Sequence, residues 1–399
     1  MEAMYQSRAL LLIQQGKFDL AEKELRSALT QDIHNALNHA YLALCLANLK
    51  KFKEAQQEAQ LAIAEEPDLA FAHYILSVIH FDEDRLKESE AAIKEALELD
   101  PEEAAFYHIL GNIHFRRRAW QKALDAANLG LALDPEDVDC LNLQARALNR
   151  LGEKNLANQS FTNAFQHAPE NHETHANQGW VYLEQNEHKL ALQHFQEALR
   201  LDPTSEFARE GLLEALKAKY WVYRAFLQFS FKISSISGAA RWALFIGVYV
   251  LVRVMPLLLP FYLMLVFFSW FSDLIFNTLL RFNRYGRMVL NQEEIKGSNL
   301  FLALFLGGIS ALAVNKIFRI EEAIPIGVVL LGMLFPVAGT LQLSNKKSRK
   351  KSFYVASAIG VLGAVAILAA FVNPELGSTL LSGFYISALL YTWFRMSLS

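Results

Sequence analysis

Three arginines of this chain lie at spacings that suit carboxylate binding. Arg146 and Arg150 are four residues apart, so on a helix both side chains project from the same face. Asn112 and Asn142 lie one helical turn before Arg116 and Arg146. Guanidinium groups bind carboxylates through paired hydrogen bonds, and amide side chains can bind an extended backbone. The pattern indicates recognition of an acidic segment or a C-terminal carboxylate, provided that the fold brings these residues together.

The elements that could position them repeat along the chain. From Glu2 to Ser205 the sequence has a period of 34 residues, present six times without insertions. Positions 8, 20 and 27 of each copy hold Ala, Gly or Ser, as at Ala43, Ala55 and Ala62. Two antiparallel helices pack closely only where the side chains at their crossing are small. Position 32 is proline in the last five copies, which ends the second helix of each pair.

This pattern resembles the tetratricopeptide repeat family, and the endings "ALELDPEE" and "ALRLDPTS" are close to the repeat ending of that family. The resemblance covers residues 2–205 and implies an all-α fold, an α-solenoid of six helix pairs. Residues 206–219 are expected to form a capping helix that covers the last repeat, so that the solenoid occupies 1–219. Family members bind an extended peptide or a partner helix in a concave groove formed by the first helices.

The resemblance assigns the groove to positions 2, 5, 6, 9, 12 and 13 of each copy. The predicted groove residues are Tyr41, Phe71, Tyr74, Phe81, His108, Asn112, Arg116, Asn142, Arg146, Arg150, Asn177 and Trp180. They favour a protein or peptide with an apolar part beside an acidic part. Alternatively, the arginines are solvated, or they pair with Asp139 and other local carboxylates. A chaperone-tail clamp is not expected, because Leu143, Glu173 and Asn177 replace its remaining polar and basic residues.

The C-terminal half has a different composition. Residues 1–219 carry 22 Lys or Arg and 35 Asp or Glu, net −13, whereas residues 220–399 carry 16 and 6, net +10. The aromatic segment 220–238 predicts an interfacial helix at headgroup depth. Residues 239–399 predict a transmembrane helical bundle of about six spans. The expected spans are 239–255, 257–280, 300–314, 323–343, 353–372 and 376–394.

Basic residues indicate the sidedness of these spans. "KKSRKK" at 346–351 and the segment 281–298 are rich in Lys and Arg, whereas the alternate connections are short or contain Glu. By the positive-inside rule the basic segments are cytoplasmic, with contact to membrane lipids as a second role. The N-terminus has no basic segment before an apolar core, so we expect no secretory signal. The prediction is an integral protein of a bacterial inner membrane with both termini cytoplasmic. A five-element region with a half-inserted first hairpin is the alternative.

The candidate intramembrane polar residues are Arg253, Asp273 and Asn277 within the predicted spans and Arg281 at the end of one. The last three are four residues apart and share one helix face. They could form an ion or lipid-headgroup site, or a polar ladder that only anchors the helix. The stretches "YWVYRAFLQFSFKIS" and "DLIFNTLLRFNRYGR" also resemble bacterial membrane proteins that combine tetratricopeptide repeats with several spans.

Several functional classes receive no support from the sequence. It has no G-x-S-x-G elbow, Walker loop, H-E-x-x-H or glycine-rich dinucleotide turn, so we expect no enzyme and no cofactor. No metal site is expected, because His39, His73 and His175 all occupy packing position 4 of a repeat. No nucleic acid is expected, because flanking spans hold the basic hexamer at the bilayer. We predict a membrane-anchored interaction scaffold; the alternative is a small transporter or channel regulated by the repeats.

Overall fold

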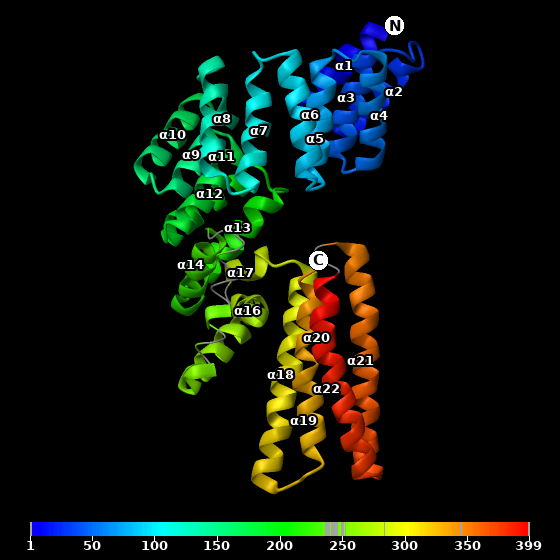
Figure 1. The fold of residues 1–399 in the computed structure, drawn as a ribbon, viewed down its shortest axis with the longest axis vertical. Helices are drawn as coiled ribbons and strands as arrows, with labels where there is room; N and C mark the ends of the chain where they lie inside the picture. The colour runs from blue at the N-terminus through cyan, green and yellow to red at the C-terminus, as the bar shows by residue number, and fades with distance from the viewer. Residues whose placement is uncertain are drawn as a thin grey trace. The chain divides into compact units, whose positions relative to one another are not determined.

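The computed structural model describes residues 2–235, 240, 246–248, 251, 253–282, 284–343 and 345–397, which are helical with turns and contain no strand (Figure 1). The chain divides into two compact units. One comprises Met1–Val181 with Glu197–Pro203, and the other comprises Tyr182–Gln196 with Thr204–Ser399. The predicted all-α class is therefore confirmed for the part of the chain that the structure describes.

The 34-residue copies fold as pairs of antiparallel helices, as Figure 1 shows from blue to green. The helices are α1 Glu2–Gln14, α2 Phe18–Leu29, α3 Ala36–Asn48, α4 Phe52–Glu65, α5 Ala70–Asp82, α6 Leu86–Leu99, α7 Ala104–Arg116, α8 Trp120–Leu133, α9 Val138–Leu151, α10 Lys154–His167, α11 His172–Glu184 and α12 His188–Leu201. In the first five pairs each first helix packs on its own second helix, and α2, α4, α6 and α8 pack on the first helix of the next pair, so the array is a solenoid.

Small residues lie where the helices cross, as the period predicts. Ala43, Ala55 and Ala62 are fully buried. At Gly111 an added Cβ would collide with the Leu143 side chain, and at Gly130 it would collide with the Cys140 sulfur. These contacts explain why positions 8 and 27 accept only the smallest side chains.

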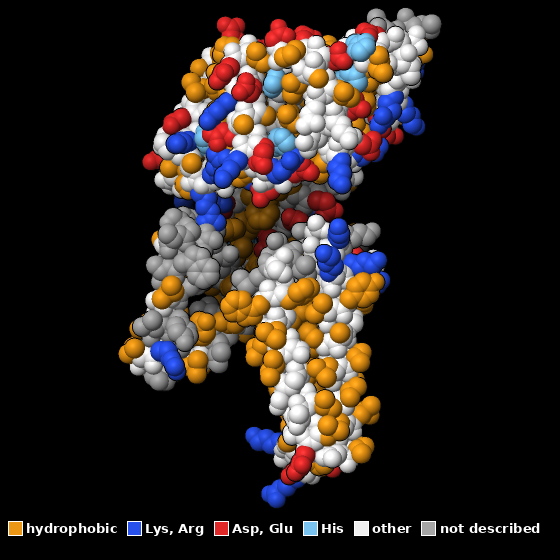
Figure 2. Space-filling view, turned by 45° about the vertical axis from the view of Figure 1, so that its right-hand side comes forward, with side chains coloured by type: hydrophobic (Ala, Val, Ile, Leu, Met, Phe, Trp, Pro, Cys, Tyr) orange, Lys and Arg blue, Asp and Glu red, His pale blue; other side chains and the backbone are white. Residues whose placement is uncertain are grey.

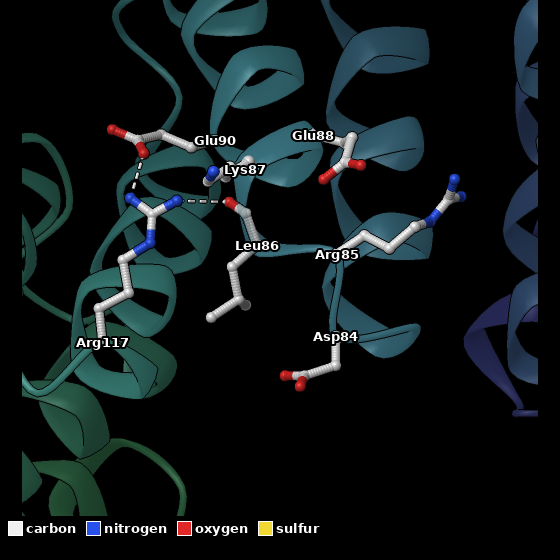
Figure 3. Close-up of a pocket in the computed structure, with 7 residues that line it drawn as sticks. All are labelled: Asp84, Arg85, Leu86, Lys87, Glu88, Glu90 and Arg117. Atoms are coloured by element: carbon white, nitrogen blue, oxygen red, sulfur yellow. Dashed lines mark hydrogen bonds and ion pairs between the residues drawn. The ribbon is translucent and has the colours of Figure 1, made fainter. Parts of the chain in front are cut away.

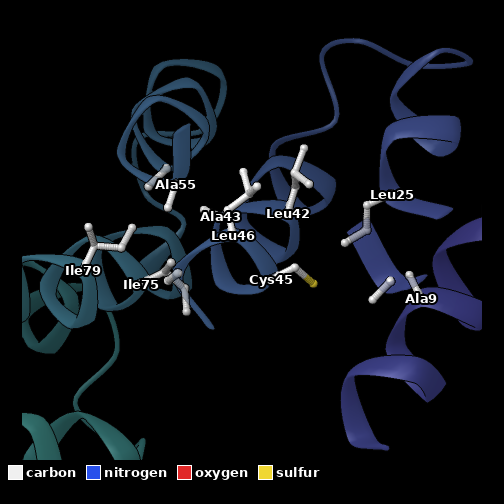
Figure 4. Close-up of a cluster of buried hydrophobic side chains, with 12 residues drawn as sticks. Ala9, Leu25, Leu42, Ala43, Cys45, Leu46, Ala55, Ile75 and Ile79 are labelled. Atoms are coloured by element: carbon white, nitrogen blue, oxygen red, sulfur yellow. The ribbon is translucent and has the colours of Figure 1, made fainter. Parts of the chain in front are cut away.

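Apolar side chains from consecutive pairs form the core of the first repeats (Figure 4). Ala9, Leu25, Leu46, Cys45 and Ile75 belong to one buried cluster. Burial raises the pKa of the Cys45 thiol to about 12. Both cysteines of the chain are free thiols inside helices, so they act as small apolar side chains.

Every helix pair turns through a residue with positive φ at position 15. The six residues are Gly16, Lys50, Asp84, Arg118, Gly152 and Asn186, with φ between 59° and 95°. The left-handed residue lets backbone N–H groups of the turn donate to carbonyl groups in the last turn of the first helix, as Lys50 N–H does to Ala47. Four of the six are Gly, Asn or Asp, the types that adopt this conformation most readily.

The second unit contains α13 Glu206–Lys217, α14 Trp221–Ser235, η1 Pro256–Leu258, α16 Leu259–Leu280, α17 Arg284–Val289, α18 Gln292–Phe318, α19 Ala323–Gly332, α20 Leu334–Leu341, α21 Lys346–Val372 and α22 Pro374–Met396. Helix α18 begins at a capping box in which Asn291 and Glu294 satisfy each other's backbone groups. Gly308 of α18 and Gly327 of α19 allow the two backbones to approach closely.

The prediction of about six spans is wrong for the residues that the structure describes. Three helical segments are long and apolar enough to cross a membrane: Gln292–Phe318, Ala323–Leu341 and Lys347–Val372. The predicted span 239–255 lies largely outside the described residues. Helix α16 covers most of the predicted span 257–280, and Val266–Leu280 is a shorter apolar segment of it. The predicted span 376–394 is helical in α22, but its serines, threonine and tyrosines reduce its hydropathy.

The basic hexamer is helical and does not form a loop between helices. It forms the first turns of α21, and the Asn345 side chain accepts hydrogen bonds from the first backbone N–H groups. Arg349 forms an ion pair with Glu293 in the first turn of α18, so both helices begin at the same end of the bundle. Figure 2 shows apolar side chains along the outer surface of these long helices. Leu306 of α18 and Val361 and Leu368 of α21 are exposed.

Candidate functional site

The predicted groove residues of repeats 2 and 3 form a row of aromatic rings on the first helices. The ring centroids of Tyr41 and Phe71 are 5.1 Å apart, and those of Phe71 and Tyr74 are 6.1 Å apart. Tyr74 stacks on Phe106 of the next repeat at 5.1 Å. Three of the four rings are half-buried, so one face of each remains at the surface. This row is an apolar surface for a ligand side chain.

The arginine of repeat 4 continues the row. The Arg116 guanidinium lies 4.5 Å from the ring centroid of Phe81, which belongs to the preceding repeat. Its Nη1 also lies 2.9 Å from Oδ1 of Asp84. The ring and the carboxylate hold the guanidinium in place. The expected pairing with a local carboxylate therefore exists for Arg116, and the carboxylate is that of Asp84.

The arginines of repeat 5 have the same arrangement. Arg146 lies 4.4 Å from the ring centroid of Phe115, and Arg150 lies 5.4 Å from that of Trp120. The two rings contact each other at 4.8 Å. Arg146 Nη1 donates to Asn112 Oδ1 at 3.3 Å. The structure thus brings together Asn112, Arg146 and Arg150, as the spacing predicts.

Three other predicted groove residues lie on the same helices. His108 of α7 is half-buried, and its Nε2 lies 2.7 Å from Asn112 Nδ2. Asn142 of α9 is buried and its Nδ2 donates to Thr174 Oγ1 of α11 at 2.9 Å. Asn177 and Trp180 are half-buried on α11. Together with the aromatic row and the arginines, these residues define the inner wall, which is the surface of α3, α5, α7, α9 and α11 that carries them.

Titratable groups of the inner wall are perturbed by their surroundings. Burial lowers the pKa of His108, and Arg146 lowers it further, so its imidazole is neutral at pH 7. Burial among protein atoms raises the pKa of the Glu173 carboxyl, although its side chain reaches solvent, and Asp139 raises it further. Burial also raises the pKa of Tyr74 to about 12. The inner wall therefore combines a basic part with a carboxylate pair.

A separate depression of about 670 Å³ lies beside the start of α6 (Figure 3). It is lined by Asp84, Arg85, Leu86, Lys87, Glu88, Glu90 and Arg117. Arg117 forms an ion pair with Glu90 and donates to the Leu86 carbonyl at 2.9 Å. Hydrogen bonds from Lys94 and Arg117 lower the pKa of Glu90 to about 2. Because Arg117 already pairs with Glu90 and the Leu86 carbonyl, its guanidinium does not make the depression an anion site.

In the second unit, Asp273 of α16 contacts α13. Lys217 Nζ lies 2.8 Å from Asp273 Oδ1 and 3.0 Å from Glu214 Oε1. The Lys217 side chain is 5% exposed, whereas that of Asp273 is 51% exposed. The Tyr223 hydroxyl donates to the second oxygen of Glu214. Burial by itself lowers the pKa of Lys217, but the two carboxylates outweigh burial and hold the pKa above its usual value.

The other polar residues predicted in the spans lie apart from this cluster. Asn277 is buried, and its Oδ1 has no hydrogen-bond partner among the described residues. Arg281 contacts the side chain of Asn299. Arg253 is exposed. The structure therefore does not bring Asp273, Asn277 and Arg281 into one polar ladder.

Two sets of residues were missed by the sequence analysis. The first is Lys217, the last residue of the "LLEALK" run, whose spacing of three from Glu214 was the available signal. The second is the hydrogen bond made by position 4 of the repeats, whose side chain bonds to the carbonyl of position 32 in the preceding repeat. His39 bonds Ile33 at 2.8 Å, His73 bonds Pro67 at 3.0 Å, and Tyr107 bonds Pro101 at 3.1 Å. These side chains therefore link each repeat to the preceding one by a hydrogen bond.

Known families and structures match the N-terminal part of the chain. Tetratricopeptide repeat models match residues 7–70, 72–138 and 172–205. The structure of pilF from Pseudomonas aeruginosa is 22% identical, with 52% of this chain and 95% of that chain covered and a TM-score of 0.42. A tetratricopeptide repeat protein from Parabacteroides merdae is 18% identical, with 53% and 82% covered and a TM-score of 0.46.

A further similar structure is YrrB, described as a TPR protein with an unusual peptide-binding site. It is 18% identical, with 47% of this chain and 96% of that chain covered and a TM-score of 0.33. No curated protein matches the sequence. The family models and the helix pairs together show that the N-terminal part of the chain is built of tetratricopeptide repeats.

Proposed function

We propose that the tetratricopeptide repeats recruit a protein partner through the inner wall, while the apolar helices of the second unit hold the complex at a membrane. The observation that carries this proposal is the set of three arginines, each stacked on a ring of the preceding repeat, beside a continuous aromatic row. Repeat arrays present extended surfaces of this kind to partners, and nothing in the proposal needs a catalytic step.

The inner wall fits a segment with an apolar part and a carboxylate. An apolar side chain would pack on the rings of Tyr41, Phe71 and Tyr74. A carboxylate would bind the guanidinium groups of Arg146 and Arg150, whose stacking limits the side-chain entropy lost on binding. A charge-assisted hydrogen bond of this type contributes about 1.5–3 kcal/mol.

The membrane part is proposed to place the array in the cytoplasm of a bacterial cell. Arg281, Arg287, Lys296 and the hexamer 346–351 lie at or before the starts of α18 and α21, on the end where Arg349 meets Glu293. At the other ends of these helices, Lys316 and Arg319 are followed by Glu321 and Glu322. The charge difference supports a cytoplasmic location for the hexamer, in contact with anionic lipids.

The bundle interior does not favour the transporter or channel alternative. Its buried hydroxyl groups on Thr340, Ser352 and Tyr391 lie 2.6–2.9 Å from one another. Hydroxyl groups that satisfy each other hold helices together and need no transported ion. We therefore propose the scaffold alone.

The proposal is tested by capture of the full-length protein from native membranes. Proteins that bind wild type are compared with those that bind an Arg116→Ala, Arg146→Ala, Arg150→Ala variant. The matched control, Arg8→Ala, Arg26→Ala, Arg200→Ala, also removes three positive charges, but from residues outside the inner wall. We expect a partner that is lost from the first variant and retained by the control. Equal recovery from all three proteins would contradict the proposal.

A further inference from the structure

Helix α9 carries a graded row of charge along one face. Asp139, Asn142, Arg146 and Arg150 are separated by three, four and four residues, which keeps them on one side of the helix. Arg146 lies about 10 Å and Arg150 about 16 Å beyond Asp139 along the helix axis, at about 1.5 Å per residue. The row thus runs from a carboxylate through an amide to two guanidinium groups.

The carboxylate end of the row is extended by the next repeat. Asn142 Nδ2 donates to Thr174 Oγ1 at 2.9 Å, which fixes the first turns of α9 and α11 beside each other. Glu173 precedes Thr174, and Asp139 lies one turn before Asn142. Both carboxylates are exposed, and neither forms a salt bridge among the described residues.

The amide of Asn142 lies at this end of the row and is buried. Its side chain is 3% exposed, and its Oδ1 has no hydrogen-bond partner in the described part of the chain. A buried amide oxygen without a donor costs about 1–3 kcal/mol relative to one that is satisfied. Asp139 and Glu173 beside this amide are exposed, so a ligand cation at this end would pair with their carboxylates.

We propose that the inner wall binds an extended segment in which a Lys or Arg lies three to five residues from an Asp or Glu. The cation would lie between Asp139 and Glu173 with Asn142, and the carboxylate would lie on Arg146 and Arg150. The spacing follows from the separation along α9, because an extended chain advances about 3.3 Å per residue. This inference rests on the proposed function and adds the charge pattern of the ligand.

A helical ligand of the same charges fits less well. It advances about 1.5 Å per residue, so its two charges would have to lie roughly seven to eleven residues apart. Its backbone N–H and C=O groups would also be satisfied within the helix, so they could not bind side chains of the inner wall. An extended segment has free backbone N–H groups along its whole length.

The test uses the full-length protein in nanodiscs and the fluorescence anisotropy of labelled 14-residue peptides with two central Phe. One peptide carries Lys and Glu four residues apart, and a second carries them ten residues apart. In a third and a fourth, Gln replaces the Lys or the Glu of the first. We expect the first peptide to bind at least tenfold more tightly than the other three.

Two variants locate the effect. In Asp139→Asn, Glu173→Gln, the tenfold advantage of Lys over Gln in the peptide should disappear, whereas the advantage of Glu over Gln should remain. In Arg146→Ala, Arg150→Ala, the advantage of Glu over Gln should disappear, whereas the advantage of Lys over Gln should remain. The inference would be overturned if neither variant lost the preference assigned to it. It would also be overturned if the peptides with four-residue and ten-residue spacings bound equally.

The outcomes separate the inference from the proposed function. If the arginine variant loses the peptide and the carboxylate variant binds all peptides as wild type does, the charge pattern is wrong and peptide recruitment stands. If no peptide responds to either variant, the inner wall is not the binding surface and both proposals fail. Circular dichroism of each variant confirms that the helices are retained.

Discussion

Lys217 and Asp273 form an ion pair with an Nζ to Oδ1 distance of 2.8 Å, which joins the helix after the last repeat to the start of the membrane part. Arg209 extends the same junction, because its Nη1 lies 3.3 Å from Glu294 at the beginning of α18. Helix α13 was expected to be a solvating cap. An added Cβ at Gly211 would collide with Phe195 of α12, so α13 packs on the second helix of the last repeat, and Leu212, Leu213 and Lys217 are buried.

Loss of the Lys217 ammonium should destabilise this junction. Lys217→Met leaves Glu214 and Asp273 close together without a cation, and removal of one partner of a buried pair costs up to about 3–5 kcal/mol. Because Asp273 is half exposed, we expect about 1–3 kcal/mol here. The measurement is the melting temperature of the full-length protein in detergent, followed by hydrogen exchange in α13 and α16.

The charge-exchanged variant Lys217→Asp, Asp273→Lys provides the matched control. It should recover part of the lost stability, because the pair is re-formed with opposite orientation. If Lys217→Met had the melting temperature of wild type and unchanged hydrogen exchange in α13 and α16, the ion pair would contribute nothing to the junction.

The first repeats should lose stability as pH rises. His39 Nδ1 lies 2.6 Å from Glu58, and its Nε2 lies 2.8 Å from the Ile33 carbonyl, so both nitrogens are placed to donate. The hydrogen bond to Glu58 raises the pKa of His39 above its usual value. A raised histidine pKa gives stability that is complete below the unfolded pKa of about 6.5 and is lost as pH rises through the folded pKa.

The variant Glu58→Gln measures this contribution. At pH 6 we expect it to be roughly 1.5–3 kcal/mol less stable than wild type, the usual value for a hydrogen bond to a charged group. The difference should narrow as pH rises through the raised pKa of His39. A difference in urea midpoint that is constant from pH 6 to pH 9 would contradict the assignment.

The repeat pattern predicted the solenoid well because every copy has the same small residues at the helix crossings. Small residues at three fixed positions and a proline at the fourth could be read directly, and Gly111 and Gly130 show the contacts that require them. The left-handed position 15 was readable in principle from Gly16, Gly152 and Asn186. The Lys and Arg in other copies obscured it, because tertiary packing overrides their preference.

The membrane part was harder to predict for a physical reason. Apolar runs indicate burial, but burial in lipid and burial against protein give the same signal. Leu274 and Phe276 of α16 are buried inside the structure, and Tyr391 of α22 is bonded to Thr340 and Ser352. Contacts between residues distant in sequence, such as Lys217 with Asp273, have no periodic signal at all.

Position 15 allows a paired test of backbone strain. Gly152→Ala introduces a side chain at φ 95°, which should cost about 1–2 kcal/mol. Arg118→Gly should be neutral or stabilising by up to about 1 kcal/mol, because φ 61° is unfavourable for arginine and free for glycine. Urea unfolding followed by circular dichroism measures both. A destabilising Arg118→Gly would indicate that the Arg118 side chain contributes more than the strain costs.

The two serines at the crossing of α5 and α6 should behave as a unit. Ser77 Oγ donates to the Ser89 carbonyl at 2.8 Å, and Ser89 Oγ donates to the Ser77 carbonyl at 2.9 Å. Both are fully buried, and the other copies have Ala or Gly at these positions. Ser77→Ala, Ser89→Ala should therefore be within about 0.5 kcal/mol of wild type, because the double change leaves no hydroxyl without a partner. A loss above about 2 kcal/mol would show that the hydroxyl pair is needed for the crossing.

Acid should weaken binding of a lysine-bearing segment before it affects the arginine contacts. Burial raises the pKa of Glu173, with a further rise from Asp139 and Asp202 and an opposing effect from His172 and Arg146. A raised carboxyl pKa means that Glu173 becomes neutral at a higher pH than usual, so attraction for the cation falls as pH decreases from 7 to 5. Anisotropy of the peptide with Lys and Glu four residues apart should show this fall in wild type. In Glu173→Gln the affinity should be lower at pH 7 and almost independent of pH, and an unchanged pH profile in that variant would assign the titration to another group.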